Sequence, residues 1–154
     1  MLKPSLTGWR AQYDRMQRSY ARVTGAYTSS VAYEDDLHHF MQDCWHLTDW
    51  IKEDPLVGIG IRHSIQTRAL KSKSLRIVKD LAMASKHLRR DNHKEGAYVT
   101  STNVTVHLGQ RHPIDVNYVV TLSDGTCTLA ESIVHEAFND WDALLRELGL
   151  SERR

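Results

Sequence analysis

The sequence predicts a single α+β domain with a three-helix N-terminal half, an antiparallel segment of two to three strands and a closing helix. Apolar residues recur at steps of three and four over most of the first 90 residues and again after residue 131, but alternate with polar residues between 97 and 130. We expect helices within 5–90, β-hairpins within 97–130 and a C-terminal helix over 131–148 that packs on the core. A length of 154 residues fits one domain spanning 1–154.

The first helix is predicted over 7–24 from a stripe of apolar and aromatic residues in line over several turns. Its aromatic rings suit a subunit interface, so we expect a homodimer; packing of the stripe on the C-terminal helix is the competing interpretation. Arg15, Arg18 and Arg22 form a separate basic stripe, expected to be solvated or to meet acidic residues of a second chain. The apolar stripe consists of Trp9, Tyr13, Met16, Tyr20, Val23 and Tyr27.

Two more helices are predicted in the N-terminal half. The second, over 31–53, has Ser30 as its expected cap, and Pro55 disfavours helical geometry at Asp54. A short helical piece is expected over 63–70, and the third helix runs from after Ser74 to near Arg89. The apolar face of the second helix comprises Leu37, Phe40, Met41, Cys44, Leu47, Thr48 and Ile51.

The strands are predicted from Tyr98 onward and end near Leu129. The dipeptide Asp124-Gly125 is typical of a two-residue hairpin turn, here between Ser123 and Thr126. The closing helix carries apolar residues at helical spacing, and Gly149 directly after it predicts a Schellman ending.

Composition excludes several classes of protein. A formal net charge of +1 argues against a strong electrostatic nucleic-acid binder. No apolar stretch approaches the roughly 20 residues of a membrane span, and no signal peptide is recognisable, so we expect a cytoplasmic protein. Cys44 and Cys127 are expected to be buried thiols and not a disulfide.

Two clusters of polar and aromatic residues are the candidate ligand site. His39, Asp43, His46 and Trp50 follow at steps of four, three and four, so they share one face of the second helix. On the third helix the matching set is Asp80, Lys86 and His87. The functional interpretation is a cleft between the two helices for an anionic, nucleotide-like ligand. The alternative is that the histidines of a core helix hydrogen-bond to backbone or carboxylates.

Two further functions stay open. One is a phosphodiesterase or ribonuclease that uses His46 and His87 as acid and base, because the pKa of histidine suits both roles near neutral pH. The other is a self-associating interaction protein with no ligand. No Cys-x-x-Cys or His-Glu-x-x-His pattern predicts zinc, and no glycine-rich phosphate loop predicts a nucleotide cofactor. We therefore expect neither a metal nor a cofactor.

Two short segments carry a resemblance to known sequences. Cys44-Trp45-His46-Leu47 with Asp49-Trp50, and Asp80-Leu81-Ala82 with 85–88, resemble paired motifs of uncharacterised bacterial and phage proteins. More loosely, the helical half is similar to HEPN domains, helical bundles that often act as ribonucleases in phage–host conflict. The catalysis of those domains uses an arginine followed by four to six residues and a histidine, and no arginine here has that spacing. The resemblance therefore implies a HEPN-like scaffold used for binding.

Overall fold

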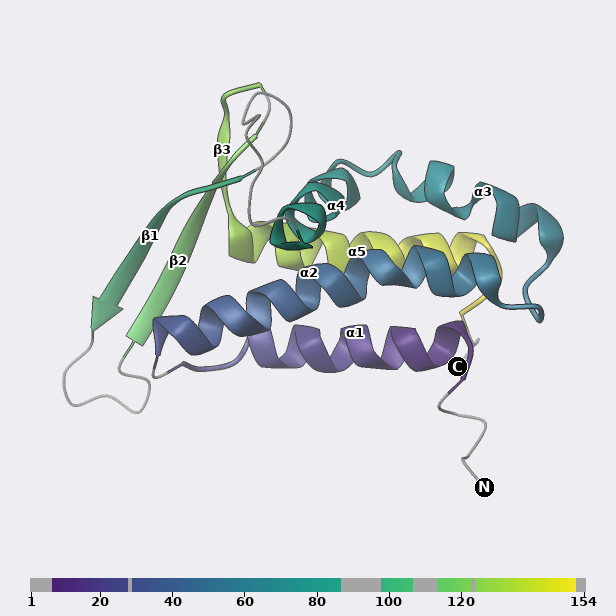
Figure 1. The fold of residues 1–154 in the computed structure, drawn as a ribbon, viewed down its shortest axis with the longest axis horizontal. Coiled ribbons are helices and arrows are strands. Elements are labelled where there is room, and N and C mark those ends of the chain that lie inside the picture. Colours follow the sequence, from purple (N-terminus) through teal and green to yellow (C-terminus); the bar gives the residue numbers. More distant parts are fainter. Residues whose placement is uncertain (1–6, 28, 87–97, 107–113, 123, 152–154) are drawn as a thin grey trace.

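The computed structural model describes residues 7–27, 29–86, 98–106, 114–122 and 124–151, with backbone alone at 84–86, 98–106 and 114–117. Helices α1, α2 and α5 lie side by side along the long axis, α4 runs across them, and the sheet stands at one end (Figure 1). The α+β class is confirmed, although four helices precede the sheet in the described residues instead of three, because the short piece expected over 63–70 is a helix of its own. The elements are α1 (Trp9–Val23), α2 (Ser30–Glu53), α3 (Ile59–Ala69), α4 (Lys73–Lys86), β1 (Tyr98–Val106), β2 (Ile114–Thr121), β3 (Cys127–Leu129) and α5 (Ala130–Glu147).

Helix α2 is the centre of the core. Every residue of its predicted apolar face is buried, from Leu37 to Ile51. Trp141 of α5 is 0% exposed, and its indole Nε1–H donates a 3.0 Å hydrogen bond to the Cys44 carbonyl in the middle of α2. Burial raises the pKa of the Cys44 thiol, so this group stays protonated and inert, as its position on the apolar face predicted.

The aromatic stripe of α1 packs within the chain. Tyr20 stacks on Phe138 of α5 with 4.1 Å between ring centroids, and its hydroxyl lies 2.8 Å from His135 Nδ1. The Tyr13 hydroxyl donates to Asp142 at 3.4 Å, and burial together with that carboxylate raises the pKa of Tyr13. Packing on α5, the competing interpretation of the stripe, therefore accounts for the feature that motivated a homodimer. The homodimer itself stays a prediction.

A side chain caps the start of α2 and backbone hydrogen bonds close the end of α5. Ser29, and not Ser30, caps α2 by accepting from the Ala32 N–H at 3.4 Å. At the other end of the chain the Leu150 N–H donates to the Leu145 carbonyl (2.9 Å) behind Gly149 at φ +69°, which confirms the predicted Schellman ending.

A serine–aspartate contact joins the start of α4 to α5. The Ser72 hydroxyl accepts from the Leu75 N–H at 3.1 Å and so caps α4. The hydroxyls of Ser72 and Ser74 both donate to Asp140 of α5, at 2.5 and 2.7 Å. The carboxylate therefore lies at the N-terminal end of α4, where the helix dipole favours negative charge.

The sheet is antiparallel, in the order β1-β2-β3. It packs on α2 and α5 through the buried face of β2, where Tyr118 is 6% and Val120 0% exposed. The Tyr118 ring meets Tyr33 of α2 edge-on, with centroids 5.2 Å apart. No helix in the described ranges is long and apolar enough to cross a membrane.

Three local expectations need correction. The hairpin turn is wider than the two residues predicted, because the Leu122 N–H donates to the Thr126 carbonyl (2.8 Å) and Gly125 has a φ of +84°. Cys127 is a free thiol but is exposed on β3 and not buried. The short helix after Pro55 begins at Ile59, earlier than expected. The parts of the predicted strands and third helix at 107–113 and 87–89 lie outside the described residues.

Candidate functional site

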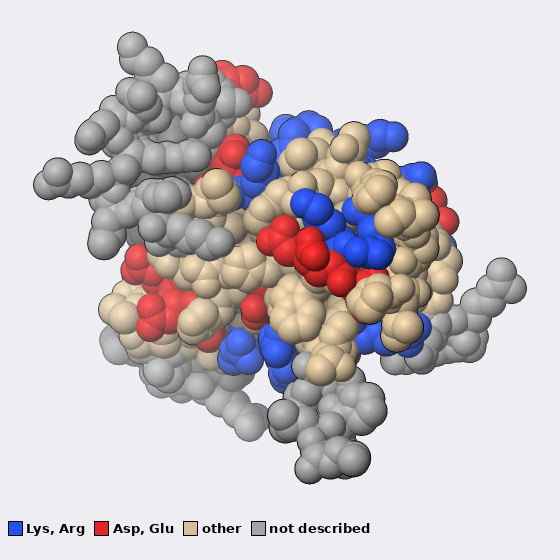
Figure 2. Space-filling model, turned by 45° about the vertical axis from the view of Figure 1, so that its right-hand side comes forward, with Lys and Arg blue, Asp and Glu red and all other residues tan. Residues whose placement is uncertain are grey.

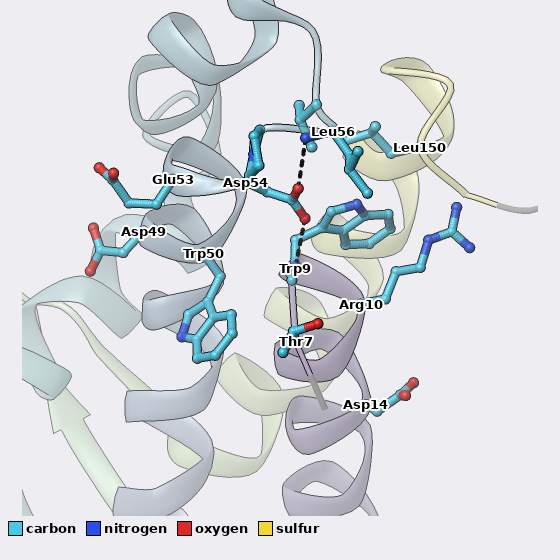
Figure 3. Close-up of a pocket in the computed structure, with 13 residues that line it drawn as sticks. Thr7, Trp9, Arg10, Asp14, Asp49, Trp50, Glu53, Asp54, Leu56 and Leu150 are labelled. Atoms are coloured by element: carbon cyan, nitrogen blue, oxygen red, sulfur yellow. Dashed lines mark hydrogen bonds between the residues drawn. The ribbon is translucent and has the colours of Figure 1, made fainter. Parts of the chain in front are cut away.

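The C-terminal end of α2 meets the N-terminal end of α1 at one buried carboxylate. Pro55 ends α2, as predicted, and leaves Asp54 in extended geometry at 8% exposure. Asp54 accepts from the Trp9 N–H through Oδ2 at 3.0 Å and from the Leu56 N–H through Oδ1 at 2.9 Å (Figure 3). Trp9 is the first residue of α1, so Asp54 caps that helix from 45 residues away along the chain. One side chain thus joins two helix ends and the turn between α2 and α3.

Gly8 allows this close approach. Its φ of 83° and ψ of 174° lie in a region that essentially only glycine adopts. A Cβ at this position would lie 2.8 Å from the Oδ2 atom of Asp54, closer than real contacts of this kind. The N-cap position of α1 therefore has no capping side chain of its own, and the carboxylate of Asp54 takes that role.

A pocket of about 980 Å³ opens beside this junction. We call it the indole pocket, because the side chains of Trp9 and Trp50 face it from α1 and α2 (Figure 3). Leu56 stands at its edge with 94% of its surface exposed. The described lining consists of Thr7, Gly8, Trp9, Arg10, Asp14, Asp49, Trp50, Glu53, Asp54, Pro55, Leu56, Val57 and Leu150.

The indole pocket has an acidic lining. Asp14, Asp49, Glu53 and Asp54 contribute four carboxylates, and Arg10 is the one basic side chain among the described lining residues. Figure 2 turns this end of the molecule forward and shows acidic side chains in a short band, with basic ones above and below it. The pocket thus combines an apolar interior with a negative edge.

Each indole of the pocket has a guanidinium near its ring. The Arg10 Cζ lies 5.2 Å from the centroid of Trp9, and the Arg15 Cζ lies 5.0 Å from that of Trp50. Arg15 also donates to the Gln12 side chain at 3.0 Å, which holds it on α1. Such cation–π contacts stabilise the ring positions by about 0.5–1 kcal/mol at exposed sites. They orient the walls of the indole pocket.

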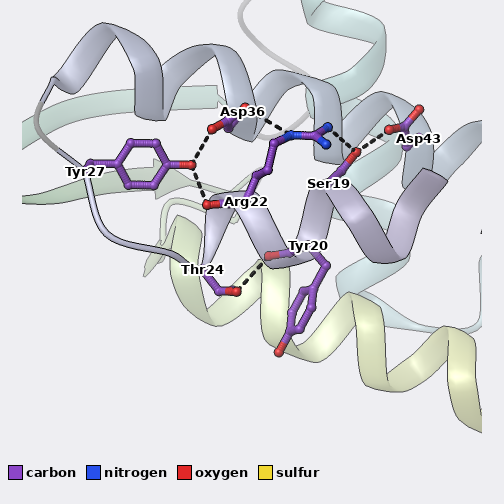
Figure 4. Close-up of polar contacts among 7 residues, drawn as sticks. All are labelled: Ser19, Tyr20, Arg22, Thr24, Tyr27, Asp36 and Asp43. Atoms are coloured by element: carbon purple, nitrogen blue, oxygen red, sulfur yellow. Dashed lines mark hydrogen bonds and ion pairs between the residues drawn. The ribbon is translucent and has the colours of Figure 1, made fainter. Parts of the chain in front are cut away.

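A row of polar contacts continues from the pocket along the α1–α2 interface (Figure 4). Asp43 accepts hydrogen bonds from the Ser19 hydroxyl and from the Gln12 amide (3.4 Å). Seven residues earlier on α2, Asp36 forms an ion pair with Arg22 at 3.4 Å. The same carboxylate accepts a hydrogen bond from the Tyr27 hydroxyl at 2.7 Å. Burial, followed by the hydrogen bond to Asp36, raises the pKa of Tyr27. These contacts account for Arg15 and Arg22 of the predicted basic stripe within one chain.

The structure separates the residues of the first predicted cluster. Asp43 is bonded to α1, Trp50 lines the indole pocket, His39 is exposed and His46 is half-buried. Among the predicted ligand-binding residues whose side chains the structure describes, Trp50 is therefore the one that belongs to this pocket. The ligand-binding roles predicted for His39, Asp43 and His46 stay predictions.

The second predicted cluster is described only in part. Asp80 is half-buried on α4, whereas the side chain of Lys86 and the whole of His87 lie outside the described residues. Helix α4 does pack on α2, where the Lys79 Nζ lies 6.0 Å from the centroid of Trp45. A cavity shared by His46 and His87 therefore stays a prediction. Within the described residues no group of three or more histidine, cysteine, aspartate or glutamate side chains could hold a metal ion.

Sequence reasoning missed most of the indole pocket. Trp9 was assigned to an interface stripe, and Asp54 was noted only as the residue before a proline. A signal was present in Gly8 directly before a helix and in the pair Asp54-Pro55 directly after one, because both are typical of chain reversals at helix ends. Nothing in the pattern indicates that these two ends meet. Comparisons with protein-family models, with curated proteins and with solved structures found no match.

Proposed function

We propose that the protein is a binding module whose site is the indole pocket. The observation that carries the proposal is an open hollow of about 980 Å³ walled by two indoles, with Leu56 at 94% exposure on its edge. Ligand pockets span roughly 300–1,000 Å³ and combine apolar walls with a few polar groups, so both size and lining suit a small ligand or a bulky side chain. Covering an exposed leucine contributes about 1.5–3 kcal/mol.

The site is held in shape before any ligand arrives. The Asp54 carboxylate fixes the first residue of α1 and the turn after α2, and Gly8 allows it to approach. Arg15 holds the Trp50 ring from the α1 side. A preformed site does not need to be ordered on binding, which favours affinity.

The chemistry of the lining favours binding over the histidine-based phosphodiesterase or ribonuclease. The described lining offers indoles, aliphatic groups, carboxylates and one guanidinium, whereas the acid and base of that mechanism were expected at His46 and His87. The predicted anionic, nucleotide-like ligand belongs to a cleft between α2 and α4, which stays a separate hypothesis. The phage–host setting, the HEPN-like scaffold, the cytoplasmic location and the self-associating alternative likewise stay predictions.

The test uses 2-phenylethanol, a neutral aromatic probe, and the indole N–H signals in ¹⁵N NMR spectra. We expect millimolar probe to shift the signals of Trp9 and Trp50, which line the pocket, but not that of Trp141, which is 0% exposed. The variant Leu56→Asp should weaken binding at least about tenfold, because it removes apolar contact worth more than 1.4 kcal/mol.

The matched control is Val31→Asp at the opposite end of α2, where an apolar side chain is 64% exposed outside the pocket. Both variants should unfold at the wild-type temperature, since neither side chain is buried. Absence of any shift at Trp9 and Trp50, or equal binding by Leu56→Asp and wild type, would reject the indole pocket as the site.

A further inference from the structure

The carboxylates of the indole pocket lie where a helix does not favour them. Asp49 and Glu53 are four residues apart on α2, and like charges at this spacing destabilise a helix. Both lie in its last turns, where the macrodipole favours cations. Asp14 lines the pocket from α1, on the side of Arg10 and across that helix from Asp49 and Glu53 (Figure 3). Proteins accept such local destabilisation at functional sites.

These carboxylates, of Asp14, Asp49 and Glu53, form no close ion pair within the part of the chain that the structure describes. Asp49 accepts a 3.2 Å hydrogen bond from the neutral Gln66 amide, and the nearby Arg62 guanidinium donates to the Lys52 carbonyl at 2.8 Å. The carboxylates at the pocket edge are therefore available to an incoming cation.

Resting on the proposed function, we infer that the indole pocket selects organic cations: protonated amines carried by an aromatic or aliphatic body. The body would lie against Trp50 and Leu56, and the ammonium would face the acidic edge. The carboxylates decide this choice, because they attract cations and repel anions. A guanidinium already lies over each indole, Arg10 over Trp9 and Arg15 over Trp50, so the edge formed by Asp49 and Glu53, and not a ring face, is the place for the ammonium.

Three probes of similar shape but different charge test the inference. The probes are 2-phenylethylamine, 2-phenylethanol and phenylacetate, titrated into the full chain and followed by the Trp50 indole N–H signal. Two unit charges about 4 Å apart interact by about 1 kcal/mol in water and more beside a protein, so the amine should bind at least about fivefold tighter than the alcohol. Phenylacetate should bind more weakly than both, and added salt should weaken the amine alone.

Charge-removing variants locate the effect. Glu53→Gln and Asp49→Asn should each lower the affinity for the amine about two- to fivefold and leave the affinity for the alcohol unchanged. The matched control is Asp35→Asn, an exposed acid in the first half of α2 outside the pocket, which should change neither. A lysine-containing peptide, acetyl-Lys-Phe-amide, compared with acetyl-Glu-Phe-amide, distinguishes a side chain of a partner protein from a free amine as the source of the same cation.

The outcomes separate the two proposals. If the alcohol binds at Trp50 but the amine binds no tighter, or if the pocket variants and Asp35→Asn behave alike, the cation preference is wrong and the binding site stands. If phenylacetate binds as tightly as the amine, the cation preference is likewise wrong. If no probe shifts the Trp50 signal, the proposed function fails and the inference fails with it.

Discussion

The contact between Gly8 and Asp54 leads to a prediction about two substitutions and their coupling. Gly8→Ala places a methyl group 2.8 Å from the Oδ2 atom of Asp54 and forces alanine into a conformation with φ near 83°. The conformation alone costs roughly 1–3 kcal/mol. The contact adds to this cost, because Asp54 is held by two backbone N–H groups and cannot retreat without losing them.

Asp54→Ala has a different cost. It removes the cap of α1, which is worth about 0.5–2 kcal/mol, and a second hydrogen bond worth about 1 kcal/mol. We therefore expect a loss of roughly 1.5–3 kcal/mol in the free energy of unfolding. For a chain of this length that loss lowers the melting temperature by about 3–12 °C.

The double variant should be more stable than the sum of the two losses predicts. Without the carboxylate, the methyl group at position 8 meets no obstacle and only the backbone cost remains. We expect a coupling free energy of about 1 kcal/mol, measured by urea unfolding followed by far-UV circular dichroism, with equal m-values in all four proteins. Losses that add to within about 0.3–0.5 kcal/mol would show that the two side chains do not meet as described.

Four further outcomes are expected. Trp141→Ala should cost about 3–5 kcal/mol in urea unfolding because its ring is fully buried, whereas Trp45→Ala should cost less because that ring is half-buried; equal costs would contradict the packing. In the native protein a thiol reagent should modify Cys127 at once and Cys44 only on unfolding, because burial raises the pKa of Cys44; fast reaction of both would place Cys44 at the surface. Burial, followed by the charge of Glu131, raises the pKa of Tyr33 from 10.0 to about 12. Because the unfolded chain loses this proton at a lower pH than the folded protein does, the free energy of unfolding should fall between these two pH values. Tyr33→Phe should reduce that fall, and an equal fall in the variant and the wild type would refute the prediction. Light scattering tests the homodimer, which a mass near 17.7 kDa at every concentration would exclude.

Helix periodicity made most of the helical fold predictable. The apolar face of α2 was identified residue by residue, because a 3.6-residue period leaves little freedom about which side is buried. The end at Pro55 and the Schellman ending at Gly149 followed from local stereochemistry. Boundaries were less well determined: neighbouring serines cap equally well in isolation, and only the path of the chain selects Ser29 over Ser30.

The candidate site was far less predictable, because it depends on which elements meet. His39, Asp43, His46 and Trp50 do share a side of α2, but the approach of α1 covers Asp43 and leaves His39 exposed. Spacing along one helix cannot show how far a neighbouring helix extends over it. The indole pocket arises from the ends of two helices that are 45 residues apart at their contact, a separation that no local pattern can bridge.

The polar contacts between α1 and α2 have a consequence for alignment. Asp36, Asp43 and Trp50 recur every seven residues on α2, and each meets a different partner on α1: an ion pair, a pair of neutral donors and a guanidinium over a ring. An apolar stripe alone would allow α1 to slide by one turn, about 5.4 Å, with little loss of buried surface. A slide would bring none of these unlike partners together again. The antiparallel pair therefore has a single longitudinal position, and that position determines whether Trp9 reaches Asp54 at all.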